Sequence, residues 1–429
     1  MNYIKDLHFQ EQVFPMFDYV TNEFSRDRLI DLFSTMPRSV DEIYARQDIF
    51  KGLLKHPELF RPPVYSPAEF IEVYDGTMNN KNRGILLEEY SYTVYLPFTT
   101  IRKQQEESKT ILIISFLKRI YEAYFSTLDI ALFPGSFGKE LAAAKNILFS
   151  LEVEKYKISS QKRPFNARQL IAKMRMLDEK VRNGQMAHFW STFFFFEAYL
   201  SIAKGIRRYN LVFPEFANTR LRIENFYHPL LKDPVKNSIE VTANVTVLTG
   251  PNMSGKSTLL KSLGLCVYLA HLGVAVPASK CEMVFYDTIF IAIDLNDNIQ
   301  SGYSHFKTEI SILKKVVSEA ANGKRCFAVF DELFRGTNSD DALSISNITI
   351  NGLAKYTGSC FFISTHLCQL KNKILENSFV DAQHVECKLV DDQPVFTYKL
   401  KKGWSDLKIG QILFEKEGLL ELFNPGDKA

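Results

Sequence analysis

Two short segments of this 429-residue chain carry the residue types and spacing that phosphate chemistry needs. The first is GPNMSGKST, in which Gly250 and Gly255 enclose four residues and Lys256 and Ser257 follow. Such glycines let backbone N–H groups curl around phosphate oxygens at a helix start, where Lys256 would reach the outer phosphates and Ser257 would bind Mg²⁺. The segment therefore predicts a P-loop that holds a nucleotide.

The second segment, CFAVFDE, is an apolar run that ends in Asp331 and Glu332. A carboxylate at a strand end beside a P-loop is suited to bind Mg²⁺, and a second carboxylate next to it can orient and deprotonate an attacking water. Thr365 and His366 follow another apolar run, SCFFIS, at the same expected sheet edge. A helix-capping threonine and a surface histidine are the alternative interpretation of that pair. The carboxylates predict hydrolysis rather than binding alone.

Two kinds of structure have to position these residues. From about residue 4 to 215 glycine is scarce and apolar residues recur at helical spacing, which predicts long helices. From about 239 onward short apolar or β-branched runs alternate with helical segments, which predicts a buried parallel sheet. The expected strands are VTVLTG (245–250), TIFIAI (288–293), CFAVFDE (326–332) and SCFFIST (359–365). We therefore predict two domains, 1–216 and 217–429.

Composition limits the alternatives. Apolar residues make up 46% and charged residues 24% of the chain, as in folded proteins, and the net charge of +3 means that nucleic-acid affinity would have to come from local patches. The six cysteines form no Cys-x-x-Cys pair, so we expect reduced, buried thiols. No apolar run has the length and lack of charge that a membrane span needs, and the N-terminus lacks the apolar core of a signal peptide. We expect a cytoplasmic protein.

The order of these segments resembles the ATPase domain of the MutS family. GPNMSGKST, LAHLGVAVPA, DNIQSGYSHFKTE, FDELFRGTNSDDAL and STH follow one another as they do there, with YHPLL before them and LKKGWSDLKIGQILFEKEG after them. The resemblance covers about 220–420, and segments at 21–59 and 197–216 are similar to the family's helical core and lever. It implies an α-helical core/lever domain followed by an α/β ABC-type P-loop ATPase domain with a mainly parallel sheet.

The resemblance also implies cofactors, partners and site residues. ATP and Mg²⁺ would be bound in two composite sites of a homodimer, each closed by Ser304 of the other chain. The implied catalytic residues are Lys256, Glu332 and His366, and the implied Mg²⁺ ligands are Ser257 and Asp331. The implied nucleotide-binding residues are Gly250, Pro251, Asn252, Met253, Ser254, Gly255, Lys256, Ser257, Thr258 and Ser304. Further matches to the family's site are Asp297, Asn298, Arg335, Gly336 and Thr337.

Three residues depart from the family's pattern. Ser254 and Phe334 stand where glycines are usual, and His305 replaces a threonine after the signature serine. We expect the change at Ser254 to be mild, because a small side chain can point away from phosphate. The changes at Phe334 and His305 put the contact with the other chain in question, but not the ATPase chemistry.

The role of the ATPase depends on what surrounds it. The core resemblance begins near residue 20, so we expect no mismatch-reading domain. Residues 155–182 hold nine lysines and arginines against two acids, with two interleaved aromatics, which would suit sequence-independent DNA binding or form a solvated helix face. The leading hypothesis is a homodimeric MutS-like ATPase that binds branched or irregular DNA in repair or recombination. The alternative is an ABC-type ATPase switch that regulates a protein partner without binding DNA.

Overall fold

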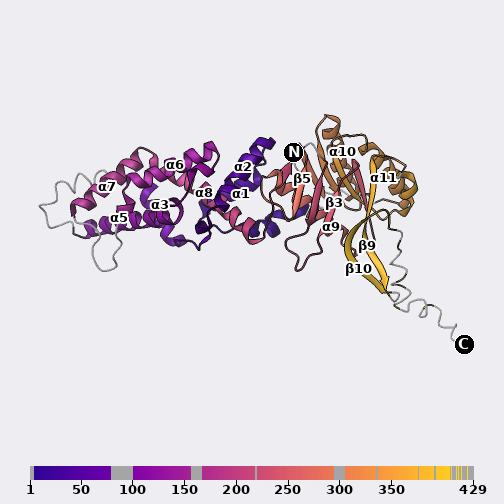
Figure 1. The fold of residues 1–429 in the computed structure, drawn as a ribbon, viewed down its shortest axis with the longest axis horizontal. Helices are drawn as coiled ribbons and strands as arrows, with labels where there is room; N and C mark the ends of the chain where they lie inside the picture. The colour runs from indigo at the N-terminus through magenta and orange to yellow at the C-terminus, as the bar shows by residue number, and fades with distance from the viewer. Residues whose placement is uncertain are drawn as a thin grey trace. The chain divides into compact units, whose positions relative to one another are not determined.

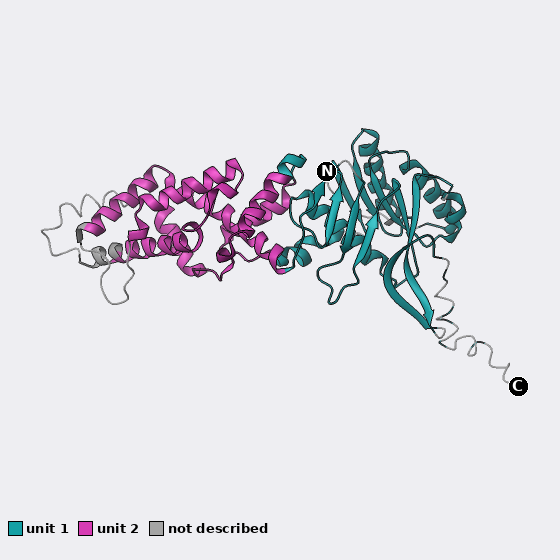
Figure 2. Cartoon of the chain, viewed as in Figure 1, with its two compact units in different colours: residues 1–16, 37–43, 209–429 teal, residues 17–36, 44–208 magenta. Residues whose placement is uncertain are grey.

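The chain forms two compact units. The structure, a computed structural model, describes residues 4–78, 100–155, 167–217, 220–293, 305–334, 337–374, 376–390 and 393–405, with a few single residues beyond them. One unit contains residues 1–16, 37–43 and 209–429, and the other contains residues 17–36 and 44–208 (Figure 2). The domain boundary that we place after residue 216 stays a prediction.

The unit of residues 17–36 and 44–208 is helical, as the apolar spacing predicts. Its helices are α1 (Glu23–Ser34), most of α2 (Val40–Leu54), α3 (Pro67–Met78), α5 (Thr100–Ile120), α6 (Gly135–Ser150), α7 (Ala167–Arg182) and α8 (Gln185–Arg208) (Figure 1). Short single turns join them at η4 (Pro57–Phe60), η7 (Tyr121–Phe125), η8 (Ile130–Leu132) and η9 (Val153–Lys155). Helix α8 is buried along most of its length, and its Trp190 donates from the ring N–H to Thr77 Oγ1 at 2.8 Å. The aromatic run on α8 is therefore the core of this unit and not a membrane span.

The other unit is built on a six-stranded sheet in the order β10-β9-β4-β8-β7-β6. Its strands are β4 (Val245–Thr249), β6 (Thr288–Ala292), β7 (Cys326–Phe330), β8 (Cys360–Ser364), β9 (Val380–Val390) and β10 (Gln393–Lys402). Neighbouring strands are parallel from β9 to β6, and only the β9–β10 pair is antiparallel. The four predicted strands are confirmed within a residue or two, and so is the mainly parallel sheet. The carboxyl ends of β4, β7 and β8 lie at one edge, which is where the predicted site residues follow.

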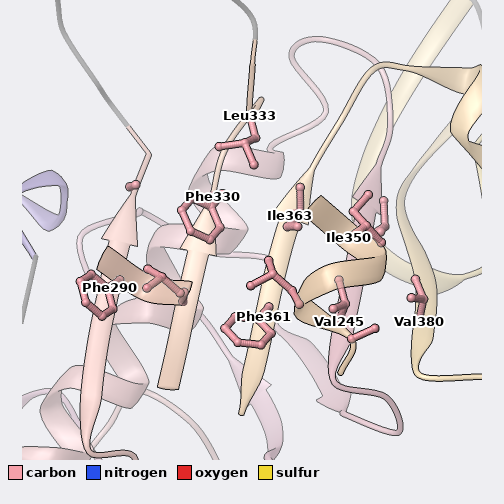
Figure 3. Close-up of a cluster of buried hydrophobic side chains, with 14 of the residues drawn as sticks. Val245, Phe290, Phe330, Leu333, Ile350, Phe361, Ile363 and Val380 are labelled. Atoms are coloured by element: carbon pink, nitrogen blue, oxygen red, sulfur yellow. The ribbon is translucent and has the colours of Figure 1, made fainter. Parts of the chain in front are cut away.

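Helices cover both faces of this sheet, since all residues of β4, β6, β7 and β8 are buried. The helices of this unit are α9 (Lys256–His271), α10 (His305–Ala321), α11 (Ser339–Leu353) and α12 (Lys371–Ile374). Side chains of α10 and α11 join Val245, Phe330 and Phe361 in one apolar cluster on one face (Figure 3). On the other face α9 approaches closely at Gly264, where a Cβ would lie 2.8 Å from the Ile291 side chain.

Two parts of this unit have no counterpart in the predicted strands. One is the β9–β10 hairpin, and the other is a four-stranded sheet in the order β1-β5-β2-β3. That sheet contains β1 (Glu215–Phe216), β2 (Arg222–Phe226), β3 (Asn237–Glu240) and β5 (Lys280–Met283). These strands are short or half-exposed, so they lack the continuous apolar runs by which buried strands are recognised.

The N-terminal segment packs on the sheet unit. It forms the single turns η1 (Lys5–Leu7), η2 (Phe9–Val13) and η3 (Phe14–Met16). The Asp6 carboxylate accepts a hydrogen bond from the Ile293 N–H at 2.8 Å, just past the end of β6, and the Phe9 ring meets Tyr268 of α9 edge-on at 5.3 Å. The first residues of the chain therefore belong to the same unit as β6 and α9, which come much later in the sequence.

The cysteines and the membrane prediction can be compared with this fold. All six cysteines are free, and four of them are buried, whereas Cys368 is exposed and Cys387 is half-buried. The prediction of buried thiols is therefore wrong for these two, which lie on the η11 turn (Cys368–Leu370) and the half-exposed β9. Among the described residues no helix is both long and apolar enough to cross a bilayer.

Candidate nucleotide site

The loop between β4 and α9 has the backbone that a phosphate site requires. Gly250 and Gly255 have φ values of 143° and 92°, a region that favours glycine, and Gly255 is the residue that caps the start of α9. Met253 also has a positive φ of 67° and its side chain is 78% exposed. The first turn of α9 therefore points its N–H groups toward the space beside the loop, as the predicted P-loop needs.

Lys256 lies across this loop. Its ammonium donates to the backbone oxygens of Gly250 at 3.0 Å and Pro251 at 3.1 Å. The pKa of Lys256 lies below its ordinary value, because burial lowers it by more than the carboxylates of Glu332 and Asp331 raise it. The charge is thus held at the mouth of the loop and is attracted to the carboxylates at the ends of the neighbouring strands.

Asp331 joins three elements at the carboxyl edge of the sheet. Its two carboxylate oxygens accept hydrogen bonds from Ser257 Oγ, at the start of α9, and from Ser364 Oγ, at the end of β8. Ser364 Oγ in turn accepts the Glu332 backbone N–H at 2.8 Å. The predicted Mg²⁺ ligands Ser257 and Asp331, which are 74 residues apart in the sequence, are therefore in direct contact.

Glu332 and His366 form a second pair beside the first. The His366 Nε2 lies 2.6 Å from Glu332 Oε1, and because an ionised carboxylate only accepts, that nitrogen carries the proton. Glu332 has a φ of 50°, so its backbone turns sharply away from β7. The hydrogen bond orients the Glu332 carboxylate, whose side chain is partly exposed. The structure thus brings all three of the predicted catalytic residues to one edge.

A cavity of about 380 Å³ adjoins the loop. It is lined by Phe226, Tyr227, His228, Leu231, Lys232, Asp233, Pro234, Val235, Asn237, Gly255, Thr258, Leu259, Ser262 and Tyr398. A Cβ on Gly255 would lie 3.1 Å from the Tyr398 ring, and the Asn237 amide spans β10 by donating to Tyr398 O at 2.9 Å and accepting from Leu400 N at 2.8 Å. The cavity has the size and the mixed apolar and polar lining of a small-molecule site.

Tyr398 and Asn237 were not among the predicted site residues. Tyr398 lies in an irregularity of the β9–β10 pairing, between Phe396 and Leu400, and has a φ of 56°. The segment YHPLL, which contains three lining residues, is identified in the sequence only through the resemblance. Sequence spacing gives no sign of Tyr398, because it reaches the loop from more than 140 residues along the chain.

The comparisons with known proteins cover this same region. Residues 246–418 match the family model described as MutS domain V. These residues are therefore similar to MutS domain V. A DNA mismatch repair protein MutS from Staphylococcus haemolyticus is 31% identical over 219 residues, which are 49% of this chain and 25% of that protein. MutS protein homolog 4 from Mus musculus is 34% identical over 222 residues, 49% of this chain and 23% of that protein.

The chain spans about a quarter of the length of these curated relatives. A third, a DNA mismatch repair protein MutS from Streptococcus sanguinis, is 32% identical over 232 residues, or 52% of this chain and 27% of that protein. The MutS domain V is an ABC-type ATPase that binds ATP. The family resemblance and the ATPase assignment are thereby confirmed for the sheet unit.

Several residues that the MutS resemblance implies fall outside the described structure. They are Asp297, Asn298, Ser304, Arg335 and Gly336. Thr337 is described, and the next residue, Asn338, starts α11 by accepting a hydrogen bond from the Asp341 N–H at 2.9 Å. His305 is the first residue of α10. The roles of these residues in a composite site stay predictions.

Ser254, the departure inside the MutS P-loop, is fully buried. Its Oγ has no hydrogen-bond partner among the described residues, and it would lie 3.0 Å from a Cβ built on Gly250. The hydroxyl therefore packs within the loop itself. The loop therefore contains a buried polar group that has no hydrogen-bond partner among the described residues.

Proposed function

We propose that this protein hydrolyses ATP with the machinery assembled at the carboxyl edge of its sheet. The observation that carries the proposal is the convergence of Ser257, Asp331 and Ser364 in one hydrogen-bonded group beside Lys256. The three elements that supply it are the ones that hold the phosphates and the metal ion in P-loop ATPases. The adjoining cavity would receive the rest of the nucleotide.

The residues present fit a magnesium ion. Ser257 and Asp331 supply a hydroxyl and a carboxylate, the hard oxygen ligands that Mg²⁺ prefers. A bound Mg²⁺ neutralises charge that develops on the phosphates. The part of the chain that the structure describes contains no group of three or more His, Cys, Asp or Glu side chains that could hold a metal. That fits an ion held by one or two protein ligands and the nucleotide.

The roles of the protein's own groups follow from their positions. Lys256 places a positive charge at the loop and stabilises the negative charge on the transferred phosphoryl group. Glu332, oriented by His366, is placed to accept a proton from the attacking water. The contact with His366 fixes the direction of one oxygen of that carboxylate.

We further propose that two chains share two composite sites. The support is the resemblance, which places Ser304 against the other chain's nucleotide. A mixing experiment tests it: Ser304→Ala and Lys256→Ala each abolish activity alone, but a mixture contains heterodimers in which one site keeps both residues. Recovery of activity on mixing is expected, and a mixture that stays inactive would rule out the shared site.

We propose that the protein as a whole recognises branched or irregular DNA. The names of the relatives, DNA mismatch repair proteins, support it, as does the basic stretch 155–182. The experiment measures the ATPase rate without DNA and with homoduplex, mismatched duplex, four-way junction or single strand. Stimulation by the junction above homoduplex is expected. No stimulation and no binding at low salt would exclude DNA, and a preference for the mismatch would contradict the predicted lack of mismatch readout.

One observation favours the alternative of a switch that acts on a protein partner. Several cations in the described part of the basic stretch are already paired, since Lys155 and Lys173 both bind Glu152 and Arg182 binds Asp178. These two lysines lower the pKa of Glu152 to about 2, so its charge persists. Phosphate contacts would have to compete with these pairs. Lys157, Lys162, Arg163 and Arg168 lie outside the residues whose side chains are described.

A further inference from the structure

A second cavity lies at the amino edge of the six-stranded sheet, at the opposite ends of the strands from the P-loop. This amino-edge cavity has a volume of about 420 Å³. Asn244, Arg325 and Ser359 line it, and they immediately precede β4, β7 and β8, the strands whose carboxyl ends carry the candidate nucleotide site. Each of these strands has five residues, so roughly 16 Å of strand separates the two edges. The amino-edge cavity is therefore separate from the nucleotide site.

Two positive charges line the amino-edge cavity. They belong to Arg220 and Arg325, and none of the described residues around them in the lining is an aspartate or a glutamate. The Arg220 guanidinium donates to the Thr242 backbone oxygen. Among the residues that the structure describes, neither guanidinium forms an ion pair with a carboxylate. The Asp287 carboxylate accepts the Arg325 backbone N–H at 2.8 Å and not the guanidinium. Both charges are thus left without a partner of opposite sign.

The turn before β8 supports the Arg325 side chain. Gly358 has a φ of 85°, and a Cβ built on it would lie 3.7 Å from both Cγ and Nε of Arg325. The stem of Arg325 therefore lies along this turn. The next residue is Ser359, whose Oγ accepts the Cys326 backbone N–H at 3.0 Å and gives its own proton to no acceptor in the described part of the chain. The wall of the cavity thus offers a guanidinium and a hydroxyl as hydrogen-bond donors.

The rest of the lining carries no charge. Leu221 and Val241 are buried apolar residues that line the amino-edge cavity. Cys360 adds a thiol, and burial raises its pKa to about 12, although Tyr286 and Arg220 oppose that shift. The thiol therefore stays protonated at neutral pH and supplies no negative charge to the arginines. The cavity combines a cationic wall of donors with an uncharged interior.

We propose that the amino-edge cavity binds a small molecule that carries a phosphate or carboxylate group on a compact apolar body. The planar fork of N–H donors on arginine fits either oxyanion with paired hydrogen bonds. A volume of about 420 Å³ suits one small ligand. A nucleic-acid strand fits less well, because linked phosphates are bound by a row of cations along an open groove. Binding here needs no ATP hydrolysis, so the two proposals stand or fall separately.

The test titrates phenyl phosphate and benzoate into the full-length protein by ligand-observed NMR, with benzyl alcohol as the uncharged analogue. The two anions distinguish a phosphate site from a carboxylate site. At least one anion should bind, and benzyl alcohol should bind at least about tenfold more weakly, because it offers the arginines no charge. Full-length Lys256→Ala should bind the anion with the same affinity, because the P-loop is not the site. The proposal is overturned if neither anion binds, if benzyl alcohol binds equally well, or if Lys256→Ala abolishes binding.

Arg325→Gln should weaken binding of the anion about tenfold or more, because it removes charge-assisted hydrogen bonds. The variant breaks no hydrogen bond or ion pair of the Arg325 side chain among the described residues, so its circular dichroism and melting temperature should match those of the wild type. Arg325→Lys, which keeps the charge but not the planar fork, should recover part of the affinity. Unchanged affinity in both Arg325→Gln and Arg220→Gln would overturn the proposal.

The matched control is Lys324→Gln, which removes the same charge one residue earlier. The Lys324 ammonium is paired with Glu319 at 2.5 Å, and Lys324 does not line the amino-edge cavity. Its loss should leave the affinity within about twofold of the wild type, because salt screens an exposed charge that does not touch the ligand. Equal weakening by Lys324→Gln and Arg325→Gln would reduce the effect to general charge and overturn the site. Displacement of the anion by a duplex oligonucleotide would assign the arginines to a nucleic-acid backbone and overturn it as well.

Discussion

The two units each contain a cluster built around a carboxylate, and the clusters differ in what surrounds it. In the helical unit, Glu197 of α8 is 7% exposed, and its carboxylate accepts hydrogen bonds at 2.7 Å from Asn22 Nδ2, Ser25 Oγ and the Tyr65 hydroxyl. In the sheet unit, Glu332 lies at the edge of the fold and is bound at one oxygen by His366. One carboxylate is enclosed by three buried donors, and the other is partly exposed and lies beside a histidine.

The difference separates a structural carboxylate from a chemical one. Burial raises the pKa of Glu197, while Tyr65, Ser25 and Asn22 oppose that shift through their hydrogen bonds. Asn22 and Ser25 lie at the start of α1, and Tyr65 lies in the segment between η4 and α3, so the cluster ties both to α8. Glu332 instead lies near Lys256 of the loop that adjoins a cavity able to accept a ligand. A perturbed carboxylate is therefore evidence of function only where there is also space for a substrate.

The largest expected effect comes from changing the two carboxylates in the same way. Glu332→Gln should lower the ATP turnover rate about 10²- to 10⁴-fold, because a carboxamide cannot accept the proton of the attacking water. ATP binding, measured with a fluorescent nucleotide, should persist. Glu197→Gln, assayed where it is folded, should turn over ATP at the wild-type rate. Turnover that persists in Glu332→Gln would show that another group is the base.

For the free energy of unfolding we expect the opposite order, with the larger loss in the Glu197 variant. Glu197→Ala leaves three buried donors without their acceptor, so the free energy of unfolding of the helical unit should fall by about 3 kcal/mol or more. Glu332→Ala, at an accessible edge, should change it far less. Urea unfolding followed by circular dichroism measures both. If Glu197→Ala lowers the free energy of unfolding by no more than an ordinary surface substitution does, the cluster does not hold the unit together.

The two clusters also differ in how many of their residues could be predicted from the sequence. Lys256, Asp331 and His366 could be predicted because their motifs lie at strand ends, and the topology of a parallel sheet brings strand ends together. Nothing near Glu197 in the sequence identifies its partners, because Asn22 lies 175 residues away and the contact depends on helix packing. In the sequence, Glu197 is a single charge within the apolar run STFFFFEAYLSIA.

Within the sheet unit, some residues beside the candidate site do not follow strand ends and could not be predicted in this way. Tyr398 reaches the P-loop through an irregularity in β10, which no motif records. Phe334 was recognised as a departure from the family, but its contact with Glu309 depends on the packing of α10. Motifs thus predicted the groups to which we assign the chemistry, whereas the residues packed around them could be found only from the fold.

The pH dependence of stability provides a smaller and more specific test. Because burial raises the folded-state pKa of Glu197 above its ordinary value of 4.5, the folded state holds that proton more tightly than the unfolded state. The stabilisation is therefore complete below the ordinary value and is lost as pH rises through the raised pKa. Lys204, which faces the carboxylate, opposes the shift. Glu197→Gln should flatten this decline in urea unfolding at a series of pH values, and an unchanged decline would assign it to other groups.

The smallest effect concerns a buried polar group that lacks the partners that Glu197 has. Ser254 is as buried as Glu197, yet its hydroxyl has no hydrogen-bond partner among the described residues. A buried hydroxyl without a partner destabilises a fold, so Ser254→Ala should raise the free energy of unfolding of the sheet unit by about 1 kcal/mol. Ser254→Gly should gain less, because glycine adds backbone entropy to the unfolded chain. If Ser254→Ala instead destabilises the unit or weakens ATP binding, the hydroxyl has a partner in the working protein, and the contrast with Glu197 fails at this position.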